Sequence, residues 1–158
     1  MTVAIRPAVR GDLDLVIGFI RALAEYERLA NEVRLSPDVL DAHLFGERPM
    51  AEVLIAELDG VPVGFALFFH NFSTFEGRPG IYLEDLFVAP EARGSGAGKA
   101  LLSHLAALTI ERGCARLEWA VLDWNAPSIA FYESLGARAM DAWKAYRLDG
   151  DPLRKLAR

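Results

Sequence analysis

The sequence has little cysteine and histidine, and these absences exclude several classes of protein. Its 158 residues include one cysteine, Cys114, and three histidines. A single cysteine cannot form an internal disulfide, and such a chain suits a reducing compartment. So few soft ligands give no convincing metal site, and we expect no metal. No apolar run reaches the ~18 residues of a membrane span, and residues 1–6 lack a signal-peptide pattern, so we expect a cytoplasmic protein without a membrane partner.

Positive charge is also scarce. The chain has 17 Lys and Arg against 22 Asp and Glu, a net charge of −5. This balance argues against a nucleic-acid partner and is compatible with a cationic substrate. Residues 1–158 have the length of one domain, and the 53% hydrophobic content is enough for a full core. We therefore expect a single domain over residues 1–158.

The hydrophobic pattern predicts an α/β protein (α+β in some schemes) with a mixed central sheet. Strand-like runs come first as a hairpin joined at Asp59-Gly60 and later alternate with a helix, which predicts both antiparallel and parallel pairs. The expected strands cover 3–6, 53–58, 61–69, 81–88, 117–122, 137–140 and 143–148, with a loop at 72–80. The expected helices cover 12–29, 37–45, 100–112 and 126–135, with a terminal turn at 154–157.

A glycine-rich run lies between the strand expected at 81–88 and the helix that follows it. Such a turn at a helix N-terminus leaves backbone N–H groups free to bind an anion, so the run predicts a site for a phosphate-bearing ligand. It is not a nucleotide P-loop, because Arg93 replaces the first glycine and Ala100 replaces the magnesium-binding hydroxyl. It is not a dinucleotide fingerprint, because Lys99 replaces the third glycine. The run consists of Arg93, Gly94, Ser95, Gly96, Ala97, Gly98 and Lys99.

Two carboxylates, Glu84 and Asp85, interrupt the apolar strand expected at 81–88. Adjacent strand residues face opposite sides of a sheet, so one of the two meets packed structure unless a bulge reorients it. A buried charge without a partner is costly, and these residues therefore need a reason to be there. One reason is pairing with a basic side chain or capping of a backbone group. The other is a role in attracting an ammonium group and taking its proton.

A third motif begins at Asn125, which is suited to cap the helix expected over 126–135. Tyr132 lies on this helix within two turns of its start, and its phenol can donate a proton at neutral pH. On its own, such a tyrosine is more often a packed aromatic residue. The motif reads Asn125, Ala126, Pro127, Ser128, Ile129, Ala130, Phe131, Tyr132.

Together these motifs resemble those of the GNAT superfamily of N-acetyltransferases. Arg93, Gly96 and Gly98 fit the Arg-x-x-Gly-x-Gly loop that holds the pyrophosphate of coenzyme A in that family, and the stretch from Asn125 looks like its second coenzyme A motif. The chain is most similar to the spermidine/spermine and thialysine N-acetyltransferases, over nearly its whole length. The resemblance implies a GNAT fold with about six to seven strands and about four helices.

The resemblance also implies an activity and a role for each matching residue. The activity is transfer of acetyl from acetyl-CoA directly to a primary amine of a small cationic metabolite, such as a polyamine or thialysine. A protein or peptide N-acetyltransferase and a non-catalytic acyl-CoA sensor remain as alternatives. The family is usually a homodimer, and we expect one here. The implied catalytic residues are Tyr132 as acid and Glu84 as base. The implied cofactor-binding residues are Leu86, Phe87, Val88, 93–99, Asn125, Ala126, Pro127, Ser128 and Tyr132. The implied substrate-binding residues are Tyr26, Glu27, Glu84, Asp85 and Tyr146.

Overall fold

The computed structural model describes residues 2–158, which divide into two compact units, one ending at Ala120 and the other covering Val121–Arg158. No helix in this part of the chain is long and apolar enough to cross a lipid bilayer. The strands are β1 (Val3–Pro7), β2 (Glu52–Leu58), β3 (Val61–Ser73), β4 (Arg78–Val88) and β5 (Leu117–Trp119). The helices are α1 (Leu13–Tyr26), α2 (Pro37–Phe45), α3 (Ala97–Glu111), α4 (Ala126–Ser134) and α5 (Gly150–Leu156), with short 3₁₀ turns at Arg10–Asp12, Ala30–Glu32 and Pro90–Ala92.

The first unit is built on a five-stranded sheet whose strands lie in chain order from β1 to β5. The strands from β1 to β4 pair antiparallel, whereas β5 pairs parallel to β4, so the predicted mixed sheet is confirmed. Asp59 and Gly60, with φ angles of 51° and 84°, form the turn that joins β2 to β3. A turn with positive φ at both positions matches the twist of the two strands. The Asp-Gly dipeptide therefore forms the predicted hairpin turn.

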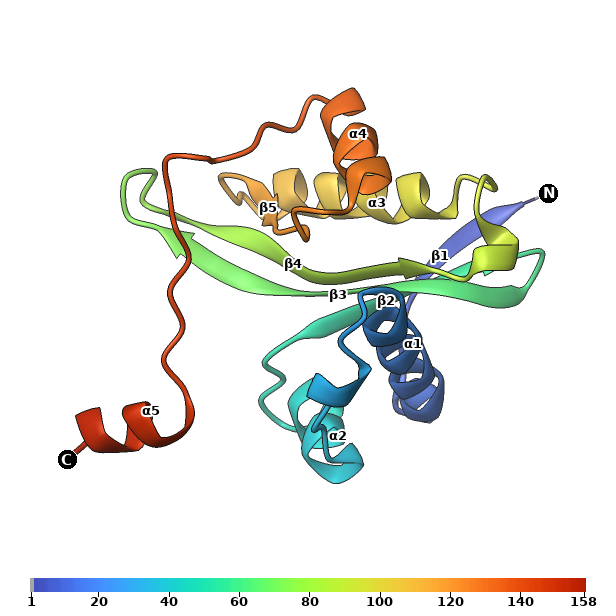
Figure 1. The fold of residues 1–158 in the computed structure, drawn as a ribbon. Helices are drawn as coiled ribbons and strands as arrows, with labels where there is room; N and C mark the ends of the chain where they lie inside the picture. Colours follow the sequence, from blue (N-terminus) through green and yellow to red (C-terminus); the bar gives the residue numbers. More distant parts are fainter. Residues whose placement is uncertain (1) are drawn as a thin grey trace. The chain divides into compact units, whose positions relative to one another are not determined.

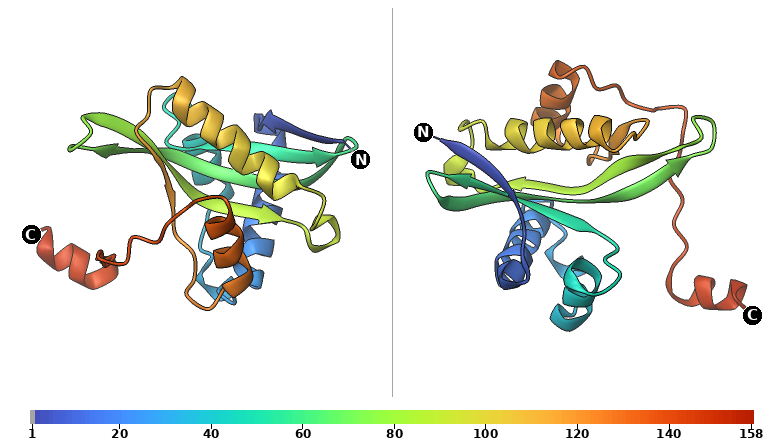
Figure 2. Two further views of the ribbon diagram at one scale, coloured as in Figure 1. Left: turned by 90° about the horizontal axis from the view of Figure 1, so that it is seen from above. Right: turned by 180° about the vertical axis from the view of Figure 1, so that it is seen from behind.

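Helices cover both faces of this sheet. Figures 1 and 2 show α1 and α2 on one face and α3 on the other. On the α1 side, Phe19 stacks on Phe65 with ring centroids 5.5 Å apart. The ring centroid of Phe87 lies 6.2 Å from that of Phe19. On the other side, Leu101 and Leu105 of α3 are completely buried. The central strands are therefore apolar on both faces, and a charged residue within them stands out.

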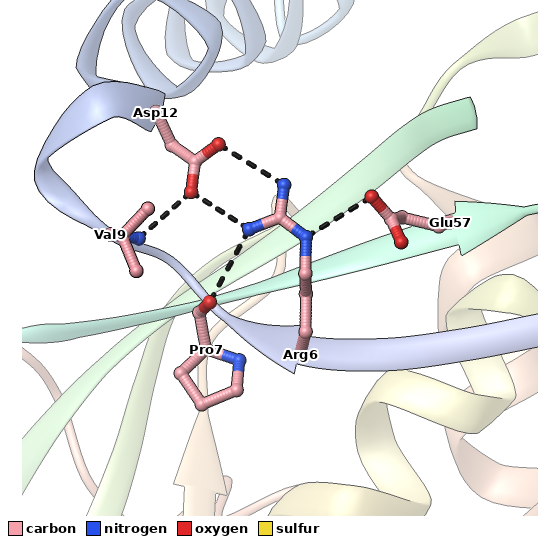
Figure 3. A network of polar contacts seen from close by, with 5 residues as sticks. All are labelled: Arg6, Pro7, Val9, Asp12 and Glu57. Atoms are coloured by element: carbon pink, nitrogen blue, oxygen red, sulfur yellow. Dashed lines mark hydrogen bonds and ion pairs between the residues drawn. The ribbon is translucent and has the colours of Figure 1, made fainter. Parts of the chain in front are cut away.

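A polar network fixes the start of α1 to the edge of the sheet (Figure 3). Arg6 on β1 donates to both carboxylate oxygens of Asp12, at 2.8 and 3.1 Å, and to Glu57 on β2 at 3.1 Å. Asp12 also accepts the backbone N–H of Val9 at 2.8 Å. The pKa of Asp12 lies below its ordinary value because Arg6 hydrogen-bonds to the ionised carboxylate. One arginine thus holds two strands and the first helix in register.

The hairpin of β3 and β4 is longer than predicted. Pairing continues from His70 opposite Ile81 to Ser73 opposite Arg78, within the loop expected at 72–80. Pro79 and Gly80 lower the strand propensity of this stretch, but the long ladder with the partner strand outweighs their local preference. Only the tip of the hairpin forms the turn.

The two last expected strands, 137–140 and 143–148, are wrong. The second unit contains no strand among its residues, and Trp143 donates instead to the carbonyl of Met140 at 3.2 Å in a local turn. A strand needs a neighbouring backbone edge for its hydrogen bonds, and residues 121–158 offer none within their own unit. The described sheet therefore has five strands rather than six or seven, β5 is shorter than expected, and α5 raises the α-helices of the described chain to five.

Candidate active site

A bulge in β4 decides where the two strand carboxylates lie. Leu83 pairs with Phe68 and Asp85 pairs with Leu67, so Glu84 is an extra residue on β4 without a partner on β3. A bulge of this kind breaks the alternation of a strand and re-aims its side chains. Glu84 is exposed and Asp85 is half-buried. The sheet therefore carries both carboxylates without burying one of them on each of its two faces.

Three carboxylates gather around this bulge. Burial raises the pKa of Asp85 from its ordinary 3.8 to about 6, and the charges of Glu84 and Glu27 add to this effect. The pKa of Glu27, the residue directly after α1, is raised by burial and by the charge of Glu84. Mutual repulsion among carboxylates means that a cation at this place would relieve unfavourable electrostatic energy. The arrangement suits an ammonium group.

The end of α1 is held in a defined conformation. Arg28 adopts a left-handed φ of 62°, and its N–H donates to Glu25 at 3.1 Å. Leu29 donates to Ala24 at 2.8 Å, the longer-range bond that closes a helix in this way. Tyr26 and Glu27 immediately precede this cap. The cap therefore fixes the positions of two residues predicted to contact the substrate.

Residues 93–96 of the glycine-rich run form the turn into α3, which begins at Ala97, three residues before the expected start at 100. Gly94 and Gly96 have φ angles of 81° and 90°, which explains why glycine stands at both positions. Ser95 Oγ accepts the N–H of Ala97 at 3.3 Å, and the helical ladder opens with the bond from Ala100 to Gly96. The N–H of Ala97 is thus occupied, whereas those of Gly98 and Lys99 have no acceptor within the helix and are available to an anion.

Gly98 differs from the other glycines of this loop. Its φ is not left-handed, and a Cβ at this position would meet only Val88, at an ordinary 3.7 Å. Neither backbone conformation nor packing among the described residues requires glycine here. Close approach of a ligand does explain it, since a side chain would keep a phosphate from the helix start. The loop therefore fits a pyrophosphate group such as that of coenzyme A.

The strand edge beside this loop is open. β5 pairs with β4 only from Ile81 to Leu83, so in the unit that ends at Ala120 no strand covers that edge beyond Leu83. This is the stretch that contains Leu86, Phe87 and Val88, of which Phe87 is buried in the core. Apart from the Val88 carbonyl, which accepts a hydrogen bond from Arg93, strand pairing within this unit leaves the outward-facing backbone groups of this edge available to an extended ligand arm.

Arg93 connects this loop to the end of α1. Its guanidinium carbon lies 4.9 Å from the ring centroid of Tyr26, and its Nε donates to the carbonyl of Val88 at 3.4 Å. The distance to the ring is within the range of a cation–π contact. Tyr26 and Arg93 lie on segments that no sequence motif connects, so this contact could not be predicted from the sequence.

The remaining predicted residues lie in the second unit. Asn125 caps α4 as expected, and its side-chain oxygen accepts the N–H of Ser128 at 3.4 Å. Tyr132 on α4 is half-buried, with its ring 5.7 Å from that of Phe131. Tyr146 follows in coil and is 93% exposed. The structure thus places Tyr26, Glu27, Glu84, Asp85 and Arg93 in one unit and the Asn125–Tyr132 motif in the other.

The described residues 2–158 contain no group of three or more histidine, cysteine, aspartate or glutamate side chains placed to hold a metal ion. The unit that ends at Ala120 offers a group of carboxylates, a glycine loop suited to a phosphate and an open strand edge, and the unit of Val121–Arg158 offers a tyrosine, Tyr132. These are the parts of an acyl-transferring enzyme that uses a nucleotide-linked acyl donor.

Residues 18–137 match the Acetyltransferase (GNAT) family, and the chain belongs to this family. It is an acetyltransferase with a GNAT fold. The bovine (Bos taurus) thialysine N-epsilon-acetyltransferase is 39% identical over 166 residues, covering 98% of this chain and 97% of that protein. The human (Homo sapiens) spermidine/spermine N(1)-acetyltransferase-like protein 1 is 29% identical over 97% of this chain, which corresponds to 23% of that protein. An integron cassette protein from Vibrio cholerae superposes with a TM-score of 0.81 at 33% identity, covering 99% of this chain and 98% of that one.

Proposed function

We propose that the protein transfers an acetyl group from acetyl-CoA directly to a primary amine of a small cationic metabolite. The observation that carries this proposal is the group of Glu27, Glu84 and Asp85 at one end of the open strand edge, with the glycine loop at the other. The names of full-length relatives support the amine class, because they include thialysine N-epsilon-acetyltransferases from cattle, pig and mouse.

Acetyl-CoA supplies the reactive acetyl thioester. Residues 93–99 hold its pyrophosphate, and the edge at Leu86–Val88 pairs with its pantetheine arm. Asn125 to Ser128 line the other side of the cofactor. The fit of the loop rests on Gly98, where a Cβ would meet only Val88 at 3.7 Å and where the close approach of a phosphate accounts for the glycine.

The carboxylates bind the amine and prepare it for attack. An alkylammonium has a pKa near 10.4, so the neutral amine costs about 4–5 kcal/mol at pH 7. Glu84 is the exposed member of the group and receives the amine proton through a water molecule, which avoids direct stabilisation of the ammonium form. Tyr26, Glu27, Asp85 and Tyr146 contact the amine substrate.

Tyr132 completes the reaction by donating its phenolic proton to the departing thiolate. No acyl-enzyme is needed in this scheme. Cys114, the sole thiol of the chain, is buried and precedes β5, where it cannot act as a nucleophile. The acetyl group therefore passes in one step from sulfur to nitrogen.

We further propose that residues 1–158 form one domain and that two copies form a homodimer in the cytoplasm. The family match runs from residue 18 to 137 and so spans both units. The second unit exposes large apolar side chains, including Trp143 at 76% and Leu156 at 75%, which favours burial against another chain. Light scattering of the purified protein tests the dimer directly.

A thiol-release assay with acetyl-CoA tests the proposed function. The acceptors are spermidine, spermine, putrescine, thialysine, lysine and short peptides with free N-termini. We expect turnover with at least one small cationic amine and weaker turnover with peptides. Preference for the peptides would make the protein a peptide acetyltransferase. Tight binding of acetyl-CoA without release of thiol to any acceptor would make it an acyl-CoA sensor.

A further inference from the structure

The side chain of Arg93 contacts both the last residue of α1 and the end of β4. Its Nε donates to Val88 at the end of β4, and its guanidinium lies over the ring of Tyr26. Among the described residues, its two terminal nitrogens donate no hydrogen bond. Arg93 therefore keeps a forked pair of donors beside the loop that fits a pyrophosphate, and a guanidinium of this kind binds phosphate oxygens in bidentate fashion.

Tyr26 offers a firm support for this guanidinium. It is the last residue of α1, directly before the cap in which Arg28 and Leu29 close the helix. Tyr26 as a residue is 36% exposed, so the stacking takes place at the surface, where a long arginine side chain otherwise samples many rotamers. Holding such a side chain in one place lowers the entropy lost when a ligand binds.

From this geometry we infer that Tyr26 is a positioning residue for acetyl-CoA: its ring holds the Arg93 guanidinium ready for a phosphate of the cofactor. The inference rests on the proposed function, and it assigns Tyr26 a role on the cofactor side in addition to any contact with the amine. Glu27, the next residue, belongs to the carboxylate group around the bulge. One turn of α1 therefore serves both halves of the site.

Steady-state kinetics at saturating amine test this role with two acyl donors. Acetyl-CoA carries the phosphates, whereas S-acetylpantetheine lacks them. In Tyr26→Leu, any loss of amine contact affects both donors alike, so we expect kcat/KM for acetyl-CoA to fall about threefold to fivefold more than that for S-acetylpantetheine, the size of an exposed cation–π contact. Tyr26→Phe keeps the ring face and should retain the wild-type ratio of kcat/KM between the two donors.

A double-mutant cycle separates positioning from a general loss of structure. Arg93→Ala should lower kcat/KM for acetyl-CoA, and adding Tyr26→Leu to it should cause no further loss, since the ring then has no guanidinium to hold. Equal losses with both donors, additive losses in the cycle, or an unchanged Tyr26→Leu enzyme would each overturn the inference. Wild-type protein that fails to bind acetyl-CoA in calorimetry would instead overturn the proposed function, and the inference with it.

Discussion

Asp85 on β4 and Glu27 at the end of α1 repel each other across the carboxylate group, and their repulsion adds to the rise in the Asp85 pKa. Burial is the larger cause of that rise, and Glu84 is the other charged neighbour. An acid with a pKa of about 6 changes charge within the range in which enzymes work. We therefore expect this group to affect both the stability and the pH dependence of the protein.

Replacing Asp85 by asparagine should stabilise the protein at neutral pH. A carboxyl whose pKa is raised by folding binds its proton more tightly in the folded state, so its contribution to stability is most favourable below 3.8 and declines as pH rises to about 6. We expect Asp85→Asn to raise the free energy of unfolding by about 1–3 kcal/mol at pH 7.5, with little effect at pH 4. Urea denaturation at the two pH values measures this difference. Asp141→Asn, at an exposed site, is the matched control, and an equal gain there would contradict the prediction.

The proton acceptor can be identified from the pH dependence of the rate. Glu84→Gln should lower kcat by about 10²–10⁴-fold and flatten the acid limb of the profile, as removal of a general base does. Asp85→Asn should keep that limb but weaken amine binding. Profiles of kcat/KM from pH 5 to 9 compare the two variants. A limb that survives in Glu84→Gln and disappears in Asp85→Asn would assign the base to Asp85.

Tyr132→Phe removes the proposed acid and keeps the ring that lies beside Phe131. We expect kcat to fall by about 10²-fold or more, because the thiolate then leaves without a proton. The dissociation constant of acetyl-CoA, measured by calorimetry, should change by less than about twofold, since a missing hydroxyl removes little binding surface. Unchanged turnover would exclude Tyr132 from the mechanism.

Two glycines of the loop should respond differently to alanine. Gly98→Ala is compatible with the fold and improves helix propensity, so stability should stay level or rise by up to about 1 kcal/mol, while acetyl-CoA affinity falls at least about tenfold. Gly94→Ala forces an alanine to adopt a φ of 81° and should lower stability by about 1 kcal/mol. Thermal unfolding and calorimetry separate the two effects. Full affinity in Gly98→Ala would mean that no phosphate approaches this position.

Asp12→Asn should destabilise the protein through loss of the Arg6 ion pair. Because the pKa of Asp12 is lowered in the folded state, its contribution is present above the ordinary value of 3.8 and disappears as pH falls through the folded pKa. We expect a loss of about 1–2 kcal/mol at pH 7 and a smaller loss in acid. Denaturation at pH 7 and at pH 3 checks this. Glu57→Gln, which leaves the Asp12 contact intact, should cost less.

The sequence allowed the central part of the fold to be predicted because its signals are local. The Asp59-Gly60 turn, the glycines before α3 and the Asn125 cap each depend on a few neighbouring residues, and all three have the predicted form. The strands expected at 137–140 and 143–148 depend on a distant backbone edge. Local alternation of apolar residues cannot show whether such an edge exists.

In the candidate site, too, features set by neighbouring residues could be predicted, and features set by distant segments could not. Motif residues such as Glu84 could be identified from their type and spacing, but their environment could not. The bulge arises from the pairing of β4 with β3, and the raised pKa of Asp85 depends on Glu27 from another element. The stacking of Arg93 on Tyr26 likewise joins segments that no motif connects.

The turn that ends α1 limits how this enzyme can be redesigned or can diverge. Glu27 contributes to the carboxylate group, so substitutions there are a natural route to a new acceptor amine. Tyr26 is its direct neighbour and contacts Arg93 of the glycine loop, so a library that randomises both positions would weaken use of the acyl donor about threefold to fivefold while it changes acceptor preference. A change of acceptor is therefore best sought at position 27 with an aromatic ring kept at position 26.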